Sequence, residues 1–251
     1  MNKETEQLIA ESLHELRTFN QKLNTAVSLV SKEIRCNKQG EKVGIEFLPE
    51  KADSLRRHVD VINYTSQLIT TRLDFVDYEL NPEFFSNMVP YEIDIYGKFH
   101  KARISLNSTI KKHNVIVNLS NEINKLRTIK AVSLIDILPY LLLENAVKYA
   151  PQESQVSVDF TQYSSAIEIT ISSEGPFTPK EEVKKLFLKG YRGENAKRLD
   201  VEGRGIGLYF ADKIVKLHDA SLAISSSSRN TFSYNGVKYS DFKVRLTFPF
   251  K

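Results

Sequence analysis

The stretch LLLENAVKYAP, residues 141–151, carries three side chains that together could hold a metal ion and a phosphate group. On a helix, Asn145, Lys148 and Tyr149 are spaced i, i+3 and i+4, so they share one face. The amide oxygen of Asn145 can bind Mg²⁺ without adding charge, and the ammonium group of Lys148 can meet phosphate as a point charge. Because amphipathic helices often carry such residues as a solvated edge, this pattern alone is a weak signal.

A glycine-rich stretch, EGRGIGLYFADKIV (residues 202–215), is a second candidate site for phosphate. Gly203, Gly205 and Gly207 open a predicted helix, whose free N–H groups would attract an anion. The stretch does not match the P-loop, because no Gly-Lys-Ser/Thr follows, nor the dinucleotide fingerprint, which needs a parallel βαβ unit. Upstream, Gly175 follows a predicted strand and would let a flat ligand approach the backbone closely.

The segment between these glycines, residues 174–204, is long for a loop and basic, as a lid over a triphosphate should be. Its basic residues include Lys189, Arg192, Lys197, Arg198 and Arg204. A lone Gly-x-Gly-x-Gly is also typical of a flexible loop. Here, however, it closes the basic segment and leads directly into a clear helical pattern.

A histidine followed by a carboxylate lies in the stretch ESLHELRTFNQKL, residues 11–23. His14 and Glu15 fall on a predicted helix, with Thr18 one turn further on. His14 lies just off the apolar stripe, so we expect its ring to be exposed. The other four histidines show no metal-ligand spacing; they are His58, His100, His113 and His218.

Two long helices are predicted to position this histidine. Residues 2–35 and a segment from Leu55 to Leu80 each carry apolar residues at alternating steps of three and four, the pattern of a heptad seam. Each seam has one polar position, Asn20 and Ser66, and the two lie level if the helices form an antiparallel hairpin. Since one hairpin cannot cover two seams well, we expect a homodimer through residues 2–80 that forms a four-helix bundle. The alternative is a monomer that buries the hairpin against its own second domain.

After Pro90 the pattern changes to mixed strands and helices. QVSVDFTQ and AIEITISS alternate apolar and polar residues over a short connection, which predicts a hairpin. Helices are predicted over FHKARISLNSTIKKH, over SLIDILPYLLLENAVKYA with Ser133 as its cap, and over IGLYFADKIVKLH. The remaining predicted strands are VPYEIDIY, VIVNLS, LAISSS and SDFKVRLTFPF, with SSSSRN (225–230) as a polar turn. This order indicates an α+β two-layer sandwich, so we predict an all-α helical hairpin over residues 1–82 and the sandwich over residues 83–251.

Taken together, these segments resemble the Bergerat-fold (GHKL) ATPases, and most closely the bacterial two-component sensor histidine kinases. LLLENAVKYAP is similar to the N box, SSEGP to the first glycine box, KLFLKGYRG to the F box of the lid, and EGRGIGLYFADKIVKLH to the second glycine box. HELRT resembles the H box, whose histidine is phosphorylated. The resemblance covers nearly the whole chain, in order and in spacing.

The resemblance implies an ATP-dependent protein-histidine kinase that uses ATP and Mg²⁺. Because the N-terminus is polar and no segment is apolar enough to span a membrane, we expect the protein to be cytoplasmic. His14 would accept the γ-phosphoryl group, Glu15 would orient the ring and take its proton, and Thr18 would position water for the reverse, phosphatase reaction. Asn145 would hold Mg²⁺. The residues implied to bind nucleotide are Asn145, Lys148, Tyr149, Ser173, Gly175, Arg192, Gly203, Arg204, Gly205, Gly207 and Leu208. The phosphoryl group would then pass to an aspartate on the receiver domain of a response regulator.

Several positions depart from the family pattern. Ser173 stands where the family usually offers an aspartate to the adenine amino group, and Phe177 replaces a glycine of the same box. Phe19 replaces the proline that usually kinks the first helix, so this helix is expected to run straighter. Leu141 stands where gyrase-like relatives carry a water-activating glutamate, which argues against an ATP-driven clamp. Glu144, next to Asn145, would point to another side of the helix.

The composition indicates which binding partners and which cellular compartment can be expected. The 251 residues are 41% hydrophobic and 26% charged, and the net charge of +4 is too mild to argue for nucleic-acid binding. The single cysteine, Cys36, fits a reducing compartment, and no apolar window is long enough to predict direct membrane insertion. A separate sensor protein docking on the bundle stays open as a partner.

Two other functions stay open from sequence. A degenerate kinase could act as a phosphotransfer scaffold or an ATP-binding switch, which Ser173 and the missing sensor domain motivate. A Bergerat-fold protein could instead phosphorylate serine on a partner, against which the HELRT hairpin argues.

Overall fold

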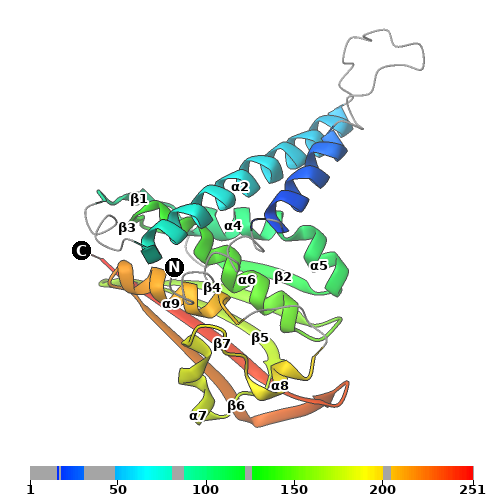
Figure 1. The fold of residues 1–251 in the computed structure, drawn as a ribbon, viewed down its shortest axis with the longest axis vertical. Coiled ribbons are helices and arrows are strands. Elements are labelled where there is room, and N and C mark those ends of the chain that lie inside the picture. Colours follow the sequence, from blue (N-terminus) through cyan, green and yellow to red (C-terminus); the bar gives the residue numbers. More distant parts are fainter. Residues whose placement is uncertain are drawn as a thin grey trace. The chain divides into compact units, whose positions relative to one another are not determined.

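The computed structural model describes residue 16 and residues 18–30, 49–80, 88–121, 126–199 and 205–250. The chain divides into two compact units, Met1–Glu83 and Phe84–Lys251 (Figure 1). The functions that the sequence assigns to the two parts of the chain stay predictions.

The first unit contains a helical segment over residues 18–30 and the helix α2 (Pro49–Leu80). α2 starts with a proline, which has no N–H to leave unbonded in a first turn. Among the side chains that the structure describes on these helices, the buried ones are Phe19, Ala26, Tyr64, Thr65 and Leu68. Three apolar residues that belong to the predicted seams are exposed instead: Val27 is 45% exposed, Val59 40% and Leu73 49%. The described helices therefore leave an apolar stripe open to solvent.

The second unit is an α+β sandwich, as the sequence predicts (Figure 1). Its five-stranded sheet has the order β2-β4-β5-β7-β6, and only the β2–β4 pair is parallel. The strands are β2 (Ile116–Asn121), β4 (Gln155–Gln162), β5 (Ala166–Pro176), β6 (Ser221–Tyr234) and β7 (Val237–Pro249). The helices α4 (Ile95–Ser105), α6 (Leu138–Tyr149) and α9 (Gly207–Leu217) pack on the sheet, and α6 lies between the other two.

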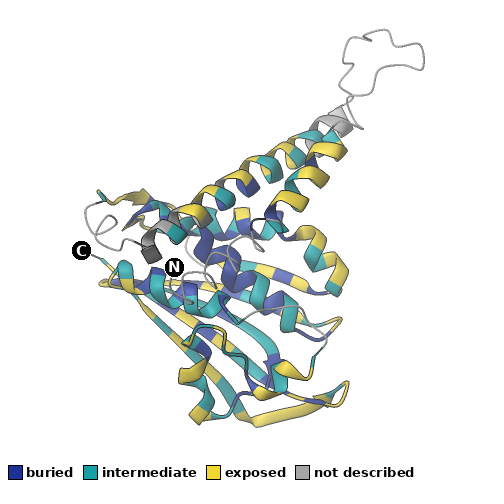
Figure 2. Ribbon diagram, viewed as in Figure 1, coloured by how far each residue is buried: buried dark blue, intermediate teal, exposed yellow. Residues whose placement is uncertain are grey.

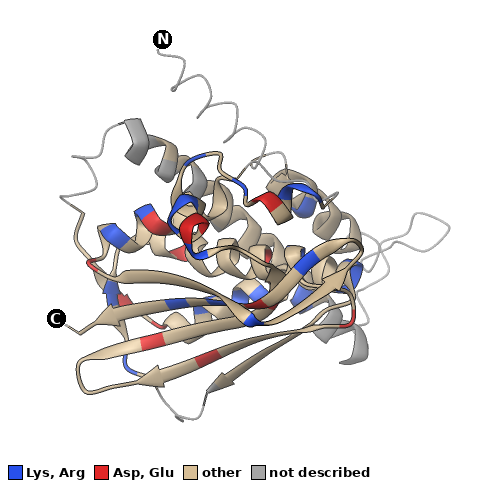
Figure 3. Ribbon diagram, turned by 90° about the horizontal axis from the view of Figure 1, so that it is seen from below, with Lys and Arg blue, Asp and Glu red and all other residues tan. Residues whose placement is uncertain are grey.

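Alternation along the strands separates the two faces of this sheet (Figure 2). On β5, Ile167, Ile169 and Ile171 are buried toward the helices, whereas the residues between them are polar and half-exposed. On that polar face Nε of Arg245 lies 3.6 Å from Oε2 of Glu168 on the neighbouring strand. Both positively and negatively charged residues occur along the strands (Figure 3). The core of this unit is therefore the layer between the sheet and α4, α6 and α9.

Several predicted elements differ from the observed ones. The helix predicted to end at His113 is two helices, α4 and α5 (Asn107–His113), which meet at Leu106, and Asn114 with φ 50° ends the second. The predicted helix from Ser133 starts as a 3₁₀ turn, η1 (Ser133–Ile137), and α6 follows with Pro139 in its first turn. The cap residue of this turn is Val132 and Ser133 is already its first residue, so the predicted role of Ser133 as a cap is wrong.

The predicted turn over residues 225–230 is also wrong, because β6 runs through it. The register with β7 shifts between Ser226 and Thr231, which takes up the extra residues as an irregularity of the ladder. The chain turns instead at Asn235-Gly236, where φ is 50° and 75°. This Asn-Gly pair is typical of a two-residue hairpin turn.

A small second sheet was not predicted in full. β1 (Tyr91–Ile93) pairs antiparallel with β3 (Ile129–Ala131), and only β1 lies in a predicted strand. The basic segment predicted as a loop also contains three short helical turns, α7 (Lys180–Val183), η2 (Lys184–Phe187) and α8 (Glu194–Lys197).

Candidate functional site

The exposed edge of α6 carries the three residues that the sequence singles out. Leu141, Leu142 and Leu143 are buried, as are Ala146 and Val147. Asn145, Lys148 and Tyr149 are half-exposed together, as their spacing predicts. α6 thus offers an amide, an ammonium group and a phenol along one edge.

Glu144, the remaining polar residue of this helix, accepts a hydrogen bond of 3.0 Å from the hydroxyl of the buried Tyr140. Leu141 is 5% exposed, so the position of a gyrase-like glutamate belongs to the apolar core. Among the described residues no group of three His, Cys, Asp or Glu could hold a metal ion. An amide oxygen beside phosphate oxygens is, however, a donor set that suits Mg²⁺.

The N-terminus of α9 lies open beside this helix. α9 packs against α6, and its cap residue Ile206 makes no side-chain capping hydrogen bond. A Cβ added to Gly207 would have no atom of the described residues within 4 Å. The first N–H groups of α9 can therefore be approached by an anion, and their partial positive charge favours one.

Gly205 serves a different purpose from Gly207. Its φ is +71°, and an added Cβ would overlap the carbonyl oxygen of Tyr191 and lie 2.7 Å from the carbonyl carbon of Gly190. The N–H of Gly190 donates to the Gly205 carbonyl over 3.1 Å. Only glycine allows this close crossing of the two backbones, which fixes where the basic segment ends and α9 begins.

One carboxylate, that of Glu182, connects separate parts of the basic segment through hydrogen bonds. Glu182 accepts hydrogen bonds from the Tyr191 hydroxyl (3.2 Å) and from the backbone N–H of Glu194 (3.3 Å). Partial burial and the charge of Glu182 raise the pKa of Tyr191. Lys197 in turn donates to Glu194 over 2.7 Å, and this hydrogen bond lowers the pKa of the Glu194 carboxyl.

Other contacts hold this segment to the sheet and to itself. The side-chain amide of Asn195 donates to the Phe177 carbonyl (2.7 Å), and the N–H of Phe177 donates to the Lys238 carbonyl on β7 (2.8 Å). The ammonium group of Lys238 lies 4.4 Å from the centre of the Phe177 ring. Arg192, a predicted nucleotide ligand, donates to the Ala196 carbonyl over 2.8 Å, so part of its guanidinium group supports α8.

At the end of β5, Ser173 continues the face of the buried isoleucines and pairs with Phe242 on β7. Gly175 lies two residues further, and a Cβ there would meet the Phe242 Cβ at 3.1 Å. The close packing against Phe242 explains why position 175 needs a glycine, and the sequence pattern does not reveal this contact. Its predicted contact with adenine stays a prediction.

Four predicted site residues, His14, Glu15, Gly203 and Arg204, lie outside the described part of the chain. Thr18 is half-buried at the start of the helical segment 18–30. Leu208, in the first turn of α9, is half-exposed.

Near the site, partial burial and the charges of Lys112 and Lys148 lower the pKa of His113, which ends α5. Its imidazole is therefore harder to protonate in the folded chain than in an unfolded one.

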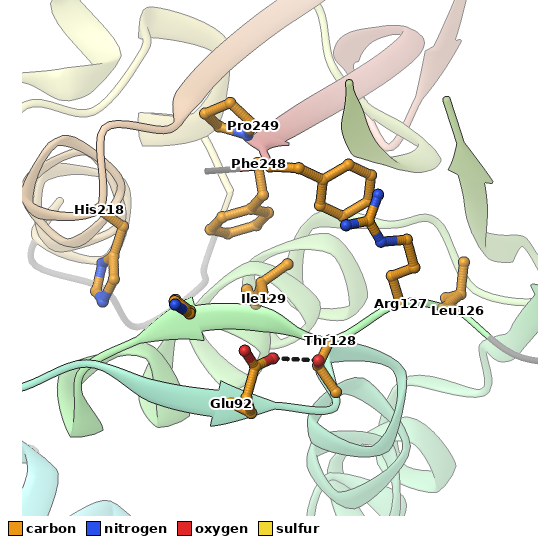
Figure 4. A pocket seen from close by; sticks show the side chains of 10 residues that line it. Glu92, Leu126, Arg127, Thr128, Ile129, His218, Phe248 and Pro249 are labelled. Atoms are coloured by element: carbon orange, nitrogen blue, oxygen red, sulfur yellow. Dashed lines mark hydrogen bonds between the residues drawn. The ribbon is translucent and has the colours of Figure 1, made fainter. Parts of the chain in front are cut away.

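A cavity of about 370 Å³ lies at the other end of the sheet (Figure 4). Phe248 and Pro249 line it, and they pair with Ile167 and Ala166 at the start of β5, far along the strand from Ser173. His218, after the last turn of α9, faces it: its Nε2 accepts from the Val132 N–H (3.1 Å), so Nδ1 carries the proton given to the Ile214 carbonyl (2.6 Å). This histidine links α9 to the chain that follows β3.

Sequence reasoning missed the structural roles of Glu182, Phe242 and His218. Phe242 alternates with Val244, Leu246 and Phe248, and this period of two was the available signal for the face it shares. The contacts of Glu182 and His218 are tertiary and leave no local pattern.

Comparison with known proteins agrees with this geometry. The sequence model of the histidine kinase-, DNA gyrase B- and HSP90-like ATPases matches residues 139–251, which run from the first turn of α6 to the end of the chain. The part of the chain that contains α6 and α9 is therefore similar to these ATPases.

Relatives that match more of the chain are sensor kinases. Sensor histidine kinase WalK of Bacillus subtilis is 24% identical over 226 residues, 88% of this chain and 34% of WalK. The histidine-protein kinase/phosphatase MprB of Mycolicibacterium smegmatis is 27% identical over 221 residues, 88% of this chain and 42% of MprB. The chain thus spans less than half the length of these relatives. The resemblance to sensor histidine kinases is confirmed.

The fold of a solved histidine kinase is also similar. The structure of histidine kinase ThkA in complex with response regulator TrrA superimposes with a TM-score of 0.52 at 13% identity, covering 98% of this chain and 61% of that one. Within the described part of this chain, no helix combines the length and the apolar character that crossing a membrane requires.

Proposed function

We propose that this chain is an ATP-dependent protein-histidine kinase of a two-component system. The observation that carries the proposal is the pairing of α6 and α9. The half-exposed edge with Asn145, Lys148 and Tyr149 lies on a helix packed against α9, and no atom of the described residues would meet a Cβ added to Gly207 at the start of α9. An amide for a metal ion, a cation for phosphate and free backbone N–H groups are what a nucleoside triphosphate needs.

Residues on α6, at the start of α9 and in the basic segment would each bind a different part of the nucleotide. Asn145 would hold Mg²⁺, and Lys148 and Tyr149 would contact the phosphates or the ribose. Gly203, Arg204, Gly205, Gly207 and Leu208 would line the phosphates at α9. The segment 180–198, with seven lysines and arginines against three glutamates, would cover them. ATP supplies the phosphoryl group, and Mg²⁺ neutralises charge on the phosphates during transfer.

Phosphoryl transfer to His14 would break the bond between the γ-phosphorus and the bridging oxygen of ADP and form a bond to an imidazole nitrogen. A neutral ring has one lone pair for the attack, and Glu15 would orient the ring and accept the proton that it loses. The phosphoryl group would pass to an aspartate on a response regulator. Thr18 would position water for hydrolysis of the phosphorylated regulator, and the related MprB is a kinase/phosphatase.

The kinase would work as a homodimer through residues 2–80. The exposed seam residues Val27, Val59 and Leu73 support this proposal, because a second hairpin could bury them in a four-helix bundle. The site would act in the cytoplasm, where ATP is available. Its partners would be a response regulator, as in the ThkA–TrrA complex, and a sensor protein docking on the bundle, with no role for nucleic acid.

The test is incubation of the full chain with γ-labelled ATP and Mg²⁺. The proposal expects label that is stable in alkali and lost in acid, because phosphohistidine is acid-labile. His14→Ala should abolish the label, whereas the matched control His58→Gln on α2 should keep it. Acid-stable label would point to a serine kinase, and label that survives His14→Ala would refute His14 as the acceptor.

A further inference from the structure

The cavity of about 370 Å³ between the small sheet of β1 and β3 and the end of β7 has no part in the proposed nucleotide site (Figure 4). Part of its wall is apolar: Ile129 of β3 and Phe248 of β7 line it and are 4% and 3% exposed. An apolar cavity of about 150 Å³ holds a benzene molecule. This cavity therefore has room for a ring that carries a short polar chain.

Arg127 brings a cation to the wall of this cavity in a fixed position. Its Cζ lies 3.9 Å from the centre of the Phe250 ring, which also lines the cavity. The Arg127 N–H donates to Oε1 of Gln162 over 2.7 Å. The Phe250 N–H donates to the Ser165 carbonyl over 2.8 Å. Backbone hydrogen bonds thus anchor both partners of the cation–π contact, and a guanidinium group that stacks by its face keeps its N–H donors at the edge.

The charges around the cavity suit a monoanion. In the described part of the chain, neither Arg127 nor Lys130 forms an ion pair. The one carboxylate in the wall is that of Glu92, which accepts a hydrogen bond from the Thr128 hydroxyl (Figure 4). His218 adds no charge, because one of its ring nitrogens accepts from a backbone N–H. The lining side chains therefore carry two positive charges and one negative charge, a net charge of +1.

We propose that this cavity binds a small monocarboxylate with a compact apolar body, such as an aromatic ring. The carboxylate would accept two hydrogen bonds from the planar guanidinium group of Arg127, and Lys130 would add a second positive charge. The apolar body would lie against Ile129 and Phe248, where burial of its surface adds affinity. The site is separate from the nucleotide and does not depend on the proposed kinase activity.

The test uses 3-phenylpropionate as the probe, and saturation-transfer difference NMR measures its dissociation constant on the full chain. We expect a dissociation constant of about 1 mM or lower. The neutral amide, 3-phenylpropanamide, has the same size and should bind at least about tenfold more weakly, because it cannot form charge-assisted hydrogen bonds with Arg127. ATP with Mg²⁺ should not displace the probe, since the two sites are separate.

Two variants change the charge of the cavity in opposite directions. Arg127→Leu should weaken binding of 3-phenylpropionate by about tenfold or more, whereas Arg229→Leu, at an exposed position of β6 outside the cavity, should not. Glu92→Gln keeps an acceptor for Thr128 but removes the negative charge, so binding should become about two- to fivefold tighter. A purely structural role of Glu92 would not produce tighter binding.

Several results would overturn this inference. They are equal affinities for the carboxylate and the amide, an unchanged affinity in Arg127→Leu, and a Glu92→Gln variant that does not bind more tightly. No binding of the probe at about 10 mM, ten times the expected dissociation constant, would also overturn it. Displacement of the probe by ATP and Mg²⁺ would place it in the nucleotide site and would refute the cavity as its binding site.

Discussion

Replacing Gly205 by alanine should destabilise the second unit where the basic segment meets α9, whereas the same change at Gly207, two residues away, should not. At Gly205 an added methyl group would occupy a left-handed backbone position, φ +71°, and overlap the backbone at Gly190 and Tyr191. The left-handed position costs alanine about 1–2 kcal/mol. Relief of the overlap would break the hydrogen bond from the Gly190 N–H, which contributes about 1 kcal/mol.

The free energy of unfolding of the second unit should therefore fall by about 2–3 kcal/mol, which corresponds to a loss of about 5–10 °C in Tm. Gly207 is the first residue of α9, and a methyl group there would meet no atom of the described residues. Alanine there should leave Tm unchanged or raise it by about 1–3 °C, because alanine favours a helix over glycine. Its methyl group should still weaken binding of ATP, since it would stand where phosphate approaches the backbone.

Differential scanning fluorimetry of the full chain, with and without ATP and Mg²⁺, measures both effects. Gly205→Ala should lower Tm in the absence of nucleotide, and Gly207→Ala should reduce only the rise in Tm that nucleotide produces. Equal Tm values for the two variants without nucleotide would refute the assignment of Gly205 to the turn. An undiminished nucleotide effect in Gly207→Ala would refute the assignment of Gly207 to the phosphate site.

Three further predictions follow from the same geometry. Asn145→Ala should weaken the Mg²⁺-dependent part of ATP binding by about tenfold or more in titration calorimetry. Asn118→Ala, on the exposed face of β2, should leave this affinity unchanged. Equal losses of affinity in the two variants would refute the metal role of Asn145. Glu182→Ala removes the carboxylate that accepts hydrogen bonds from Tyr191 and Glu194, so trypsin should cleave the basic segment several-fold faster. Glu181→Ala, at the exposed neighbouring position, should not change the rate of cleavage. An unchanged rate in Glu182→Ala would contradict the role of these hydrogen bonds. Burial and two neighbouring lysines lower the pKa of His113, so the unfolded chain binds a proton more readily below about pH 6.5, its unperturbed value. The free energy of unfolding in urea should therefore fall as pH drops from 7.5 to 5.5, and His113→Gln should reduce that fall; an identical fall in both proteins would refute this reasoning.

The edge of α6 could be predicted from sequence because it depends only on helical spacing. Asn145, Lys148 and Tyr149 are three and four residues apart, and the leucines before them identify the buried side. The β4–β5 hairpin could be predicted for the same reason, from a period of two. Local patterns of this kind survive in the structure because tertiary packing agrees with them.

What could not be predicted depends on partners distant in sequence. The close approach of Gly205 to Gly190 and Tyr191 cannot be read from a motif whose glycines are typical of a phosphate site. The serines of β6 favour a turn locally, but pairing with β7 holds them in a strand across an irregular register. β3 is three residues long, too short for alternation to be recognised, and is defined by its pairing with β1.

The central claim is that ATP binds between the edge of α6 and the N-terminus of α9. Hydrogen exchange of the full chain, followed by mass spectrometry with and without ATP and Mg²⁺, tests it most directly. The first N–H groups of α9 have no acceptor within the helix, so their exchange should slow on binding, together with peptides covering residues 141–150. Peptides covering residues 126–132, beside the cavity of Figure 4, should not change. Protection at residues 126–132, with none at residues 205–212, would contradict the site.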